Sequence, residues 1–523
     1  MLQAMLSKPI SKRISFLLGS FFLFLYWLIG FDGITFSDDV YYLLAGKDFW
    51  DGSMEVNGYH FSSRWGAYVP AGLMAWIFGF DPHKISLISW ISYMGTLALL
   101  LKALPKNSNP GILLLFFCTQ VYLLHFLTKV YPDSLLVFWT ILIPFSAIYR
   151  KEKPILAALG VISGLFFGFI TKETIVLLAP LPVLLFFWDR KRENLNSAFY
   201  WAILGFGVLF GAGYLGYFWM QFGDPFYRVS SINAGHYVSE FTYADKGIWS
   251  ILRRISYLPV LTFIERAYWI WVVLAIPGFY KVWKNKDSEG MEMALAAVCL
   301  ILGFWFMTST LEFYNPIYLN PRHLIILVPI FSYLIALGWK EWQQKPKLKK
   351  GMQFMLLLGV LVSGIQGDLK MAGFHLAFLA WFSLPFLNRN GIALPALLLA
   401  PAIASIFYQH RIKDYSNFKE SLLKESTTDS TPILVNNFVH FSREVLLPTD
   451  INGQSLLLPI EKLDSLAPSL GDSFRVFLYD YYRHAYPKEE EDVLKLESWL
   501  LEEAELVSEE KTGKVWIRKF QKR

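Results

Sequence analysis

The first apolar run of the chain, residues 14–31, reads ISFLLGSFFLFLYWLIGF and decides the class of protein. A helix that crosses a bilayer needs roughly 20 mostly apolar residues, and this run approaches that length without a single charge. Lys8, Lys12 and Arg13 precede it, and no small-residue cleavage site follows it. The pattern therefore predicts a first membrane-spanning helix that stays in the protein, rather than a signal peptide that is removed.

Similar runs continue to residue 408 and predict an all-α polytopic membrane domain. The composition agrees, because 54% of the residues are hydrophobic and 17% are charged, against about 45–50% and about 25% in soluble domains. The shorter apolar stretch 67–80 is expected to lie as a helix at the membrane interface. About thirteen transmembrane helices are predicted, near residues 14–31, 84–101, 111–128, 135–149, 155–170, 174–188, 197–220, 267–283, 291–309, 322–339, 352–366, 371–387 and 391–408.

Basic residues are unevenly distributed among the predicted loops. With the N-terminus in the cytoplasm, Lys and Arg are about three times denser in the cytoplasmic loops than in the outer loops, as the positive-inside rule requires. The basic run from Lys345 to Lys350 is the clearest cytoplasmic determinant. An odd number of crossings then places the C-terminal segment outside. The net charge of +6 is accordingly a topology signal, and no nucleic-acid partner is predicted.

Residues 409–523 differ in character and predict a small extracytoplasmic α/β domain. Apolar runs at 432–435 and 474–479 are typical of strands, Glu489–Leu501 of a helix and Lys514–Lys519 of a final strand. The predicted division is a transmembrane domain, 1–408, with long outer loops at 32–66 and 221–266, followed by the soluble domain.

Acidic and basic residues gather at the predicted outer ends of the helices. Acids and cations on one membrane face suit the transfer of a sugar from a lipid phosphate to a polar acceptor. A carboxylate can take the proton of the acceptor hydroxyl, and fixed cations, arginine above all, can stabilise the departing phosphate. The clusters are Ser37-Asp38-Asp39-Val40-Tyr41-Tyr42, His60–Trp65, Lys129–Ser134, Thr171-Lys172-Glu173, Gly223–Arg228 and Asn320–His323.

The order of these motifs resembles the GT-C superfamily of polyprenyl-phosphate-sugar glycosyltransferases, within it the protein O-mannosyltransferase and lipid A aminoarabinose transferase branch. Four stretches carry the resemblance, Ser37–Tyr42, Phe61–Gly79, Gly164–Pro180 and Pro321–Pro329. It covers roughly residues 14–340. The sequence after Arg64 lacks the diproline usual in this family, which leaves the role of Arg64 open.

The resemblance implies a function and a set of site residues. It implies an inverting glycosyltransferase of the cytoplasmic (inner) membrane. This enzyme would move a sugar from a polyprenyl-phosphate donor to a lipid, glycan or protein acceptor on the extracytoplasmic face. The catalytic acids would be Asp38, as the base, with its neighbour Asp39, and Asp133, which would position the acceptor or, in metal-using members, a divalent ion. The lipid phosphate would be held by Arg64, Lys172, Arg322 and His323.

Each of these residues has an alternative role. Asp38 and Asp39 could cap a helix, since Ser-Asp-Asp before an apolar run is typical of a helix start. Arg64 and Arg322 could be interfacial anchors, and Asp133 a turn residue. Lys172 could be the ion-pair partner of Glu173, and His323 a solvated or polar-pocket histidine. For the whole chain, the alternatives are a transporter or flippase of lipid-linked sugars and a scaffold without activity. A divalent metal ion also stays open, because two neighbouring aspartates supply no complete ligand set.

Overall fold

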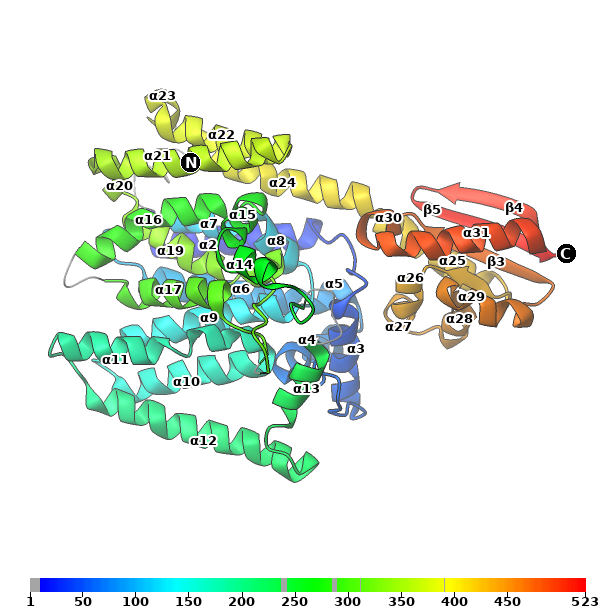
Figure 1. Ribbon diagram of the computed structural model, residues 1–523, viewed down its shortest axis with the longest axis horizontal. Helices are drawn as coiled ribbons and strands as arrows, with labels where there is room; N and C mark the ends of the chain where they lie inside the picture. Colours follow the sequence, from blue (N-terminus) through cyan, green and yellow to red (C-terminus); the bar gives the residue numbers. More distant parts are fainter. Residues whose placement is uncertain (1–9, 237–241, 285–288, 311, 390) are drawn as a thin grey trace.

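A helical bundle with a small sheet domain at one end makes up the protein (Figure 1). The computed structural model describes residues 10–236, 242–284, 289–310, 312–389 and 391–523. The bundle helices run mainly along the long axis of the molecule, and the sheet domain continues that axis beyond them. The predicted class, a helical membrane domain followed by a small α/β domain, is confirmed.

Within the described residues, six helices are long and apolar enough to cross a membrane. The number rises to eight if two bent pairs each count as one span. The predicted total of about thirteen is therefore not confirmed. The six are α2 (Lys12–Ile29), α5 with α6 (Pro82–Ile85, Leu87–Ala103), α10 (Pro154–Thr171), α12 (Ser197–Phe222), α21 (Pro346–Ile365) and α24 with α25 (Ala393–Lys413, Tyr415–Thr428). Shorter apolar helices are α4 (Trp65–Phe78), α9 (Pro132–Ile148) and α17 (Met291–Phe306).

Several predicted spans are interrupted. The run 111–128 forms α7 (Pro110–Cys118) and α8 (Val121–Leu127), which are bent by 68°. The bend is stabilised by Gln120, whose side chain accepts a hydrogen bond from the Leu123 N–H (2.7 Å) and so begins a new helix. A second bend of 109° separates α15 (Leu258–Glu265) from α16 (Trp269–Lys284). The remaining bundle elements are η1 (Glu173–Leu178), α11 (Leu181–Lys191), α14 (Ile248–Ile255), α18 (Pro321–Leu324), α19 (Leu327–Gly338), α20 (Glu341–Gln344), α22 (Leu369–Ser383) and α23 (Pro385–Arg389).

The outer loop predicted at 32–66 contains a helix, α3 (Asp38–Asp51), that packs against α4. The two backbones meet at Gly46 and Gly72, where an added Cβ on Gly72 would lie 2.0 Å from the Gly46 carbonyl oxygen. Only glycine permits this approach. Helix α3, together with α13 (Tyr227–His236), lies at the end of the bundle that faces the sheet domain (Figure 1). The turn from α11 to α12 lies at the opposite end.

The C-terminal domain is a five-stranded mixed sheet between helices. Its order is β2-β1-β3-β5-β4. Strand β1 is parallel to β2 and β3, and β5 is antiparallel to both of its neighbours, β3 and β4. Side chains alternate along β3, so Phe474 contacts Trp499 of α31 on one face while Phe477 and Tyr479 contact Phe418 of α25 on the other. The strands are β1 (Ile433–Val435), β2 (Leu457–Pro459), β3 (Ser473–Tyr479), β4 (Ala504–Thr512) and β5 (Val515–Lys522). The helices after α25 are α26 (Asn437–Phe441), α27 (Arg443–Leu446), α28 (Ile451–Leu456), η2 (Ile460–Lys462), α29 (Leu463–Leu466), η3 (Ala467–Ser469), α30 (Tyr482–Ala485), η4 (Pro487–Glu489) and α31 (Glu490–Glu503).

The predicted strands and helix of this domain are confirmed as β1, β3, β5 and α31. Strand β4 was missed because its sequence, AELVSEEKT, is charged and almost wholly exposed at the sheet edge. Helix α24 continues to Lys413 and leads directly into the domain, so the predicted division at residue 408 falls inside a helix and stays a prediction.

Candidate active site

Two neighbouring aspartates open helix α3, and the second of them is buried. The carboxylate of Asp39 accepts hydrogen bonds from the N–H groups of Thr35 (2.6 Å), Ser37 (3.1 Å) and Val40 (3.1 Å). It also accepts one from the Thr35 hydroxyl (2.7 Å). Asp39 is the second residue of α3, after the N-cap Ser37, so its carboxylate ties the preceding turn to the first turn of the helix. The geometry therefore favours a structural role for Asp39 at the start of α3, since a reaction at this carboxylate would leave its four donors without their partner.

Asp38 begins a chain of ion pairs across one end of the bundle. Its carboxylate lies 2.8 Å from the Arg322 guanidinium, whose Nε lies 3.7 Å from the Asp133 carboxylate, and Asp133 lies 2.6 Å from the Lys172 ammonium. The side chains of Asp38 and Arg322 are each 22% exposed, whereas those of Asp133 and Lys172 are 1% and 6% exposed. Four residues from α3, α9, α18 and the end of α10 thus meet in one chain, and the end at Asp38 is open.

Two buried polar atoms in the middle of this chain of ion pairs make no hydrogen bond within the part of the protein that the structure describes. Arg322 Nε and Asp133 Oδ2 are both buried and have no hydrogen-bond partner among the described residues. The Arg322 guanidinium lies 5.0 Å from the centroid of the Tyr131 ring. The Asn320 side chain accepts a hydrogen bond from the backbone N–H of Arg322 (3.0 Å). Tyr131 and Asn320 hold Arg322 in place, and its remaining donor suits an anion with several oxygens, such as a phosphate.

Lys172 is a buried cation whose charge is sensitive to its neighbours. Burial lowers the pKa of its ammonium to about 8, although the carboxylate of Asp133 raises it. The guanidinium groups of Arg322 and Arg64 lower it further. Lys172 is therefore protonated at neutral pH and loses its proton as the pH rises through about 8.

A second cluster surrounds Glu173, the residue after Lys172. Its carboxylate lies 2.8 Å from Arg64 and 2.6 Å from Arg228. Burial raises the pKa of Glu173, but these two guanidinium groups outweigh it and hold that pKa well below its usual range. Arg64 also donates to the Tyr42 hydroxyl (2.7 Å). Arg64 and Arg228 share a single carboxylate, so this cluster keeps one net positive charge. The predicted role of Arg64 as a phosphate ligand stays a prediction.

His323 is tied to the loop that precedes α18. Its Nδ1 donates to the Tyr318 carbonyl oxygen (3.1 Å), which gives this residue an anchoring contact beside Arg322.

Sequence reasoning missed three residues near the site. Arg228 was noted only as part of a loop motif, and Lys413 was not considered. Lys129 forms an ion pair with Asp32, and Lys413 reaches the same carboxylate at 3.5 Å. Lys413 follows the predicted end of the last span at residue 408, in the predicted soluble domain, and its distance along the chain from Asp32 hid the pairing.

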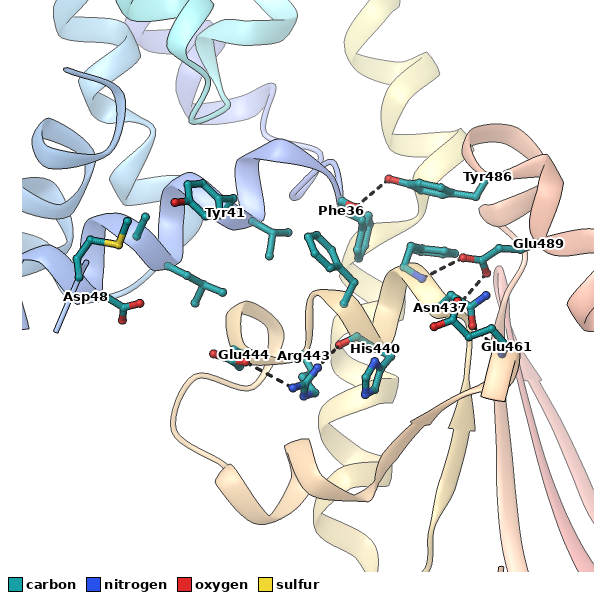
Figure 2. A pocket seen from close by; sticks show the side chains of 16 residues that line it. Phe36, Tyr41, Asp48, Asn437, His440, Arg443, Glu444, Glu461, Tyr486 and Glu489 are labelled. Atoms are coloured by element: carbon teal, nitrogen blue, oxygen red, sulfur yellow. Dashed lines mark hydrogen bonds and ion pairs between the residues drawn. The ribbon is translucent and has the colours of Figure 1, made fainter. Parts of the chain in front are cut away.

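Three cavities lie around the ion-pair chain. The largest, about 730 Å³, separates α3 from the C-terminal domain; Figure 2 shows Tyr41 and Asp48 on one side and Asn437, His440 and Glu489 on the other. A groove of about 410 Å³ between α10 and α12 is lined almost wholly by apolar side chains. A third pocket of about 370 Å³ borders Arg322.

Among the described residues, no group of three or more His, Cys, Asp and Glu side chains is arranged to hold a metal ion. Asp38 pairs closely with Arg322 and Asp133 with Lys172, and the two carboxylates do not meet at a shared point. These residues do not fit a bound divalent ion.

Comparison with known proteins identifies the fold. Neither a protein-family model nor a curated protein matches the sequence. The crystal structure of ArnT from Cupriavidus metallidurans bound to undecaprenyl phosphate matches with a TM-score of 0.59 at 12% identity, over 96% of this chain and 97% of that chain. The crystal structure of that protein in the apo state matches with a TM-score of 0.57 at 12% identity, again over 96% of this chain and 97% of that chain. The chain has the GT-C fold.

The GT-C likeness extends over nearly the whole of both chains, so it includes the bundle, the outer helices and the C-terminal domain. Together with the long apolar helices, it identifies the chain as a multi-pass membrane protein. Of the residues predicted from the sequence, this GT-C structure brings Asp38, Asp133, Lys172 and Arg322 into one chain of ion pairs.

Proposed function

We propose that this protein is an inverting glycosyltransferase that moves a sugar from a polyprenyl-phosphate donor to an acceptor at the extracytoplasmic face of the cytoplasmic membrane. The N-terminus is cytoplasmic and the C-terminal domain extracytoplasmic in this proposal. One observation carries it. A partly exposed carboxylate, Asp38, and a partly exposed guanidinium, Arg322, lie 2.8 Å apart at the outer end of a GT-C bundle, with a second cation, Lys172, behind them.

The donor lipid has a suitable place in the apolar groove between α10 and α12. Ile175 and Val176, which line this groove, follow Lys172 by three and four residues. Arg228 lines the groove itself, whereas Arg322 borders the third pocket. The proposal therefore requires the lipid phosphate to extend from the groove toward the Lys172 ammonium and the Arg322 guanidinium. The structural likeness to ArnT bound to undecaprenyl phosphate supports a polyprenyl-phosphate ligand.

The reaction is a single in-line displacement. The acceptor hydroxyl oxygen forms a bond to the anomeric carbon while the bond from that carbon to the phosphate oxygen breaks. Asp38 takes the hydroxyl proton, and the polyprenyl phosphate leaves with its negative charge against Arg322 and Lys172. Asp38 and the donor phosphate compete for the same guanidinium, so donor binding would release the Asp38 carboxylate for this proton transfer.

The acceptor would enter from the cleft between α3 and the C-terminal domain. Phe36, Val40 and Tyr41, which flank Asp38 along the chain, line this cleft. Its aromatic, amide and carboxylate side chains suit a hydroxylated acceptor, through ring contacts and hydrogen bonds.

Membranes that contain the protein can test this proposal with radiolabelled undecaprenyl-phosphate sugars. We expect labelled acceptor and free undecaprenyl phosphate from the wild type. Asp38→Asn should lower the rate about 10²–10⁴-fold, the usual contribution of a general base, with normal membrane insertion. Asp51→Asn, at the exposed C-terminal end of the same helix, is the matched control. Unchanged transfer in Asp38→Asn refutes the proposal, and movement of intact donor across the bilayer would indicate a flippase instead.

A further inference from the structure

The turn that precedes Asp38 has an unusual backbone conformation. Phe36 has φ 59°, in the left-handed region that side chains other than those of Gly, Asn and Asp rarely adopt. Such a conformation persists only where the surrounding structure holds it. Phe36 lies two residues before the proposed base, so whatever holds this turn also sets the start of α3.

The C-terminal domain provides the surroundings of this turn. The Phe36 ring is 2% exposed, and it packs against a box of five rings that all come from residues after α24. The ring centroids lie at 5.0 Å from Phe438, 5.6 Å from Phe418, 6.1 Å from Tyr415, 6.1 Å from Tyr479 and 6.2 Å from Tyr481.

Tyr486 adds a polar contact to the same turn. Its hydroxyl lies within hydrogen-bond distance of the carbonyl oxygens of Thr35 (2.9 Å) and Phe36 (3.0 Å); in Figure 2 the dashed line from Tyr486 ends at Phe36. Gly33 lies so close to the Tyr415 ring that a Cβ added to Gly33 would be 2.1 Å from the ring. The loop between α2 and α3 is therefore held by the soluble domain rather than by the bundle alone.

From this turn, direct contacts lead to the proposed reacting groups. Thr35 donates from its N–H and its hydroxyl to Asp39, in the first turn of α3. The Thr35 hydroxyl also lies 2.6 Å from the Tyr131 hydroxyl, and the Tyr131 ring lies against Arg322. Thr35 thus contacts Tyr486 on one side and both Asp39 and Tyr131 on the other. Asp39 fixes the start of α3, where Asp38 lies, and Tyr131 packs against Arg322.

We infer that the C-terminal domain positions the catalytic turn, with Tyr486 and Phe36 as the positioning residues. This inference rests on the proposed function and gives the soluble domain a role in it. Both residues also line the proposed acceptor cleft. Their positioning effect, through the backbone of residues 35–37 and through Asp39, is therefore read from kcat at saturating acceptor.

The first test removes only the Tyr486 hydroxyl. Tyr486→Phe should lower kcat about five- to tenfold, the effect of one hydrogen bond expressed in a transition state, while the donor KM stays within about twofold. Tyr482→Phe is the matched control, because Tyr482 is a buried tyrosine of the same domain whose hydroxyl accepts from Arg483 Nε (3.2 Å) instead. Equal kcat in the two variants overturns the inference.

The second test separates backbone strain from anchoring. Phe36→Gly relieves the strain, because glycine adopts positive φ readily, but it removes the ring from the box. We expect kcat to fall at least as far as in Tyr486→Phe. Full activity in Phe36→Gly would mean that anchoring by the C-terminal domain is not needed.

A readout that does not depend on catalysis distinguishes this inference from the proposed function. Amide hydrogen exchange across residues 32–40 should be faster in Tyr486→Phe than in the wild type and in Tyr482→Phe, since the turn opens more often without its contact. Unchanged exchange overturns the inference, whatever the activity. If the wild type transfers no sugar but the exchange difference is found, the proposed function fails and the positioning of the turn stands.

Discussion

Lys172 has two roles in the proposed site, and a pair of substitutions can separate them. It neutralises the buried carboxylate of Asp133 at 2.6 Å, and it is proposed to hold the donor phosphate. Lys172→Met removes the ammonium but keeps a long apolar side chain. The single variant should lose both stability and activity, whereas Lys172→Met combined with Asp133→Asn should regain stability and stay inactive.

The expected loss of unfolding free energy follows from the ion-pair distances around Asp133. With an effective dielectric of about 20, the attraction at 2.6 Å is about 6 kcal/mol, and the attraction between Asp133 and Arg322 at 3.7 Å is about 4 kcal/mol. Breaking a buried ion pair typically costs about 3–5 kcal/mol. Because Arg322 still compensates Asp133 in part, we expect Lys172→Met to lose about 3 kcal/mol of unfolding free energy. The double variant should lose only about 1 kcal/mol, since an amide needs far less compensation than a carboxylate.

The assay combines unfolding in mixed micelles with sugar transfer in proteoliposomes. Activity should fall about 10²-fold in both variants, the effect of removing one group that stabilises a developing charge. If the double variant is as unstable as the single one, Lys172 has a structural role apart from Asp133. If Lys172→Met transfers sugar at the wild-type rate per folded molecule, Lys172 does not hold the phosphate and the reasoning is refuted.

Three further predictions follow from the same contacts. The kcat/KM for the donor should fall as the pH rises through about 8, where Lys172 loses its proton. Lys172→Arg should move this alkaline fall in kcat/KM to higher pH, and a fall at the same pH in both proteins would exclude Lys172 as its cause. Arg150→Met should cost about 3–5 kcal/mol of unfolding free energy, because Arg150 pairs with Asp189 and Glu292 at buried sites. It should leave kcat per folded molecule unchanged, since Arg150 lies past the end of α9 opposite Asp133; a large loss of kcat there would contradict the proposed location of the site. His440→Ala in the cleft should raise the acceptor KM several-fold with little change in kcat, and an effect on kcat alone would argue against acceptor binding in this cleft.

Much of the architecture was predictable because it depends on local composition. Residues 14–31 contain no charge, and a segment of this kind satisfies its backbone in lipid only as a helix. Helix α31 and strands β1, β3 and β5 were also predicted, because each is short and shows the periodicity of its own structure. The interruption at Gln120 was not predicted, since a polar residue inside an apolar run does not by itself reveal a bend of 68°.

What the sequence determined alone was the class of fold, the motifs at the outer ends of the helices and the residue types that the proposed chemistry needs. It could not separate Asp38 from Asp39, because the two are the same residue type in adjacent positions. Only the tertiary structure decided this. The positive φ of Phe36 and the donors of Thr35 turn Asp39 inward toward the preceding turn and leave Asp38 facing Arg322. A helix periodicity reports which residues share a face, whereas an ion pair between residues hundreds of positions apart depends on how the helices pack.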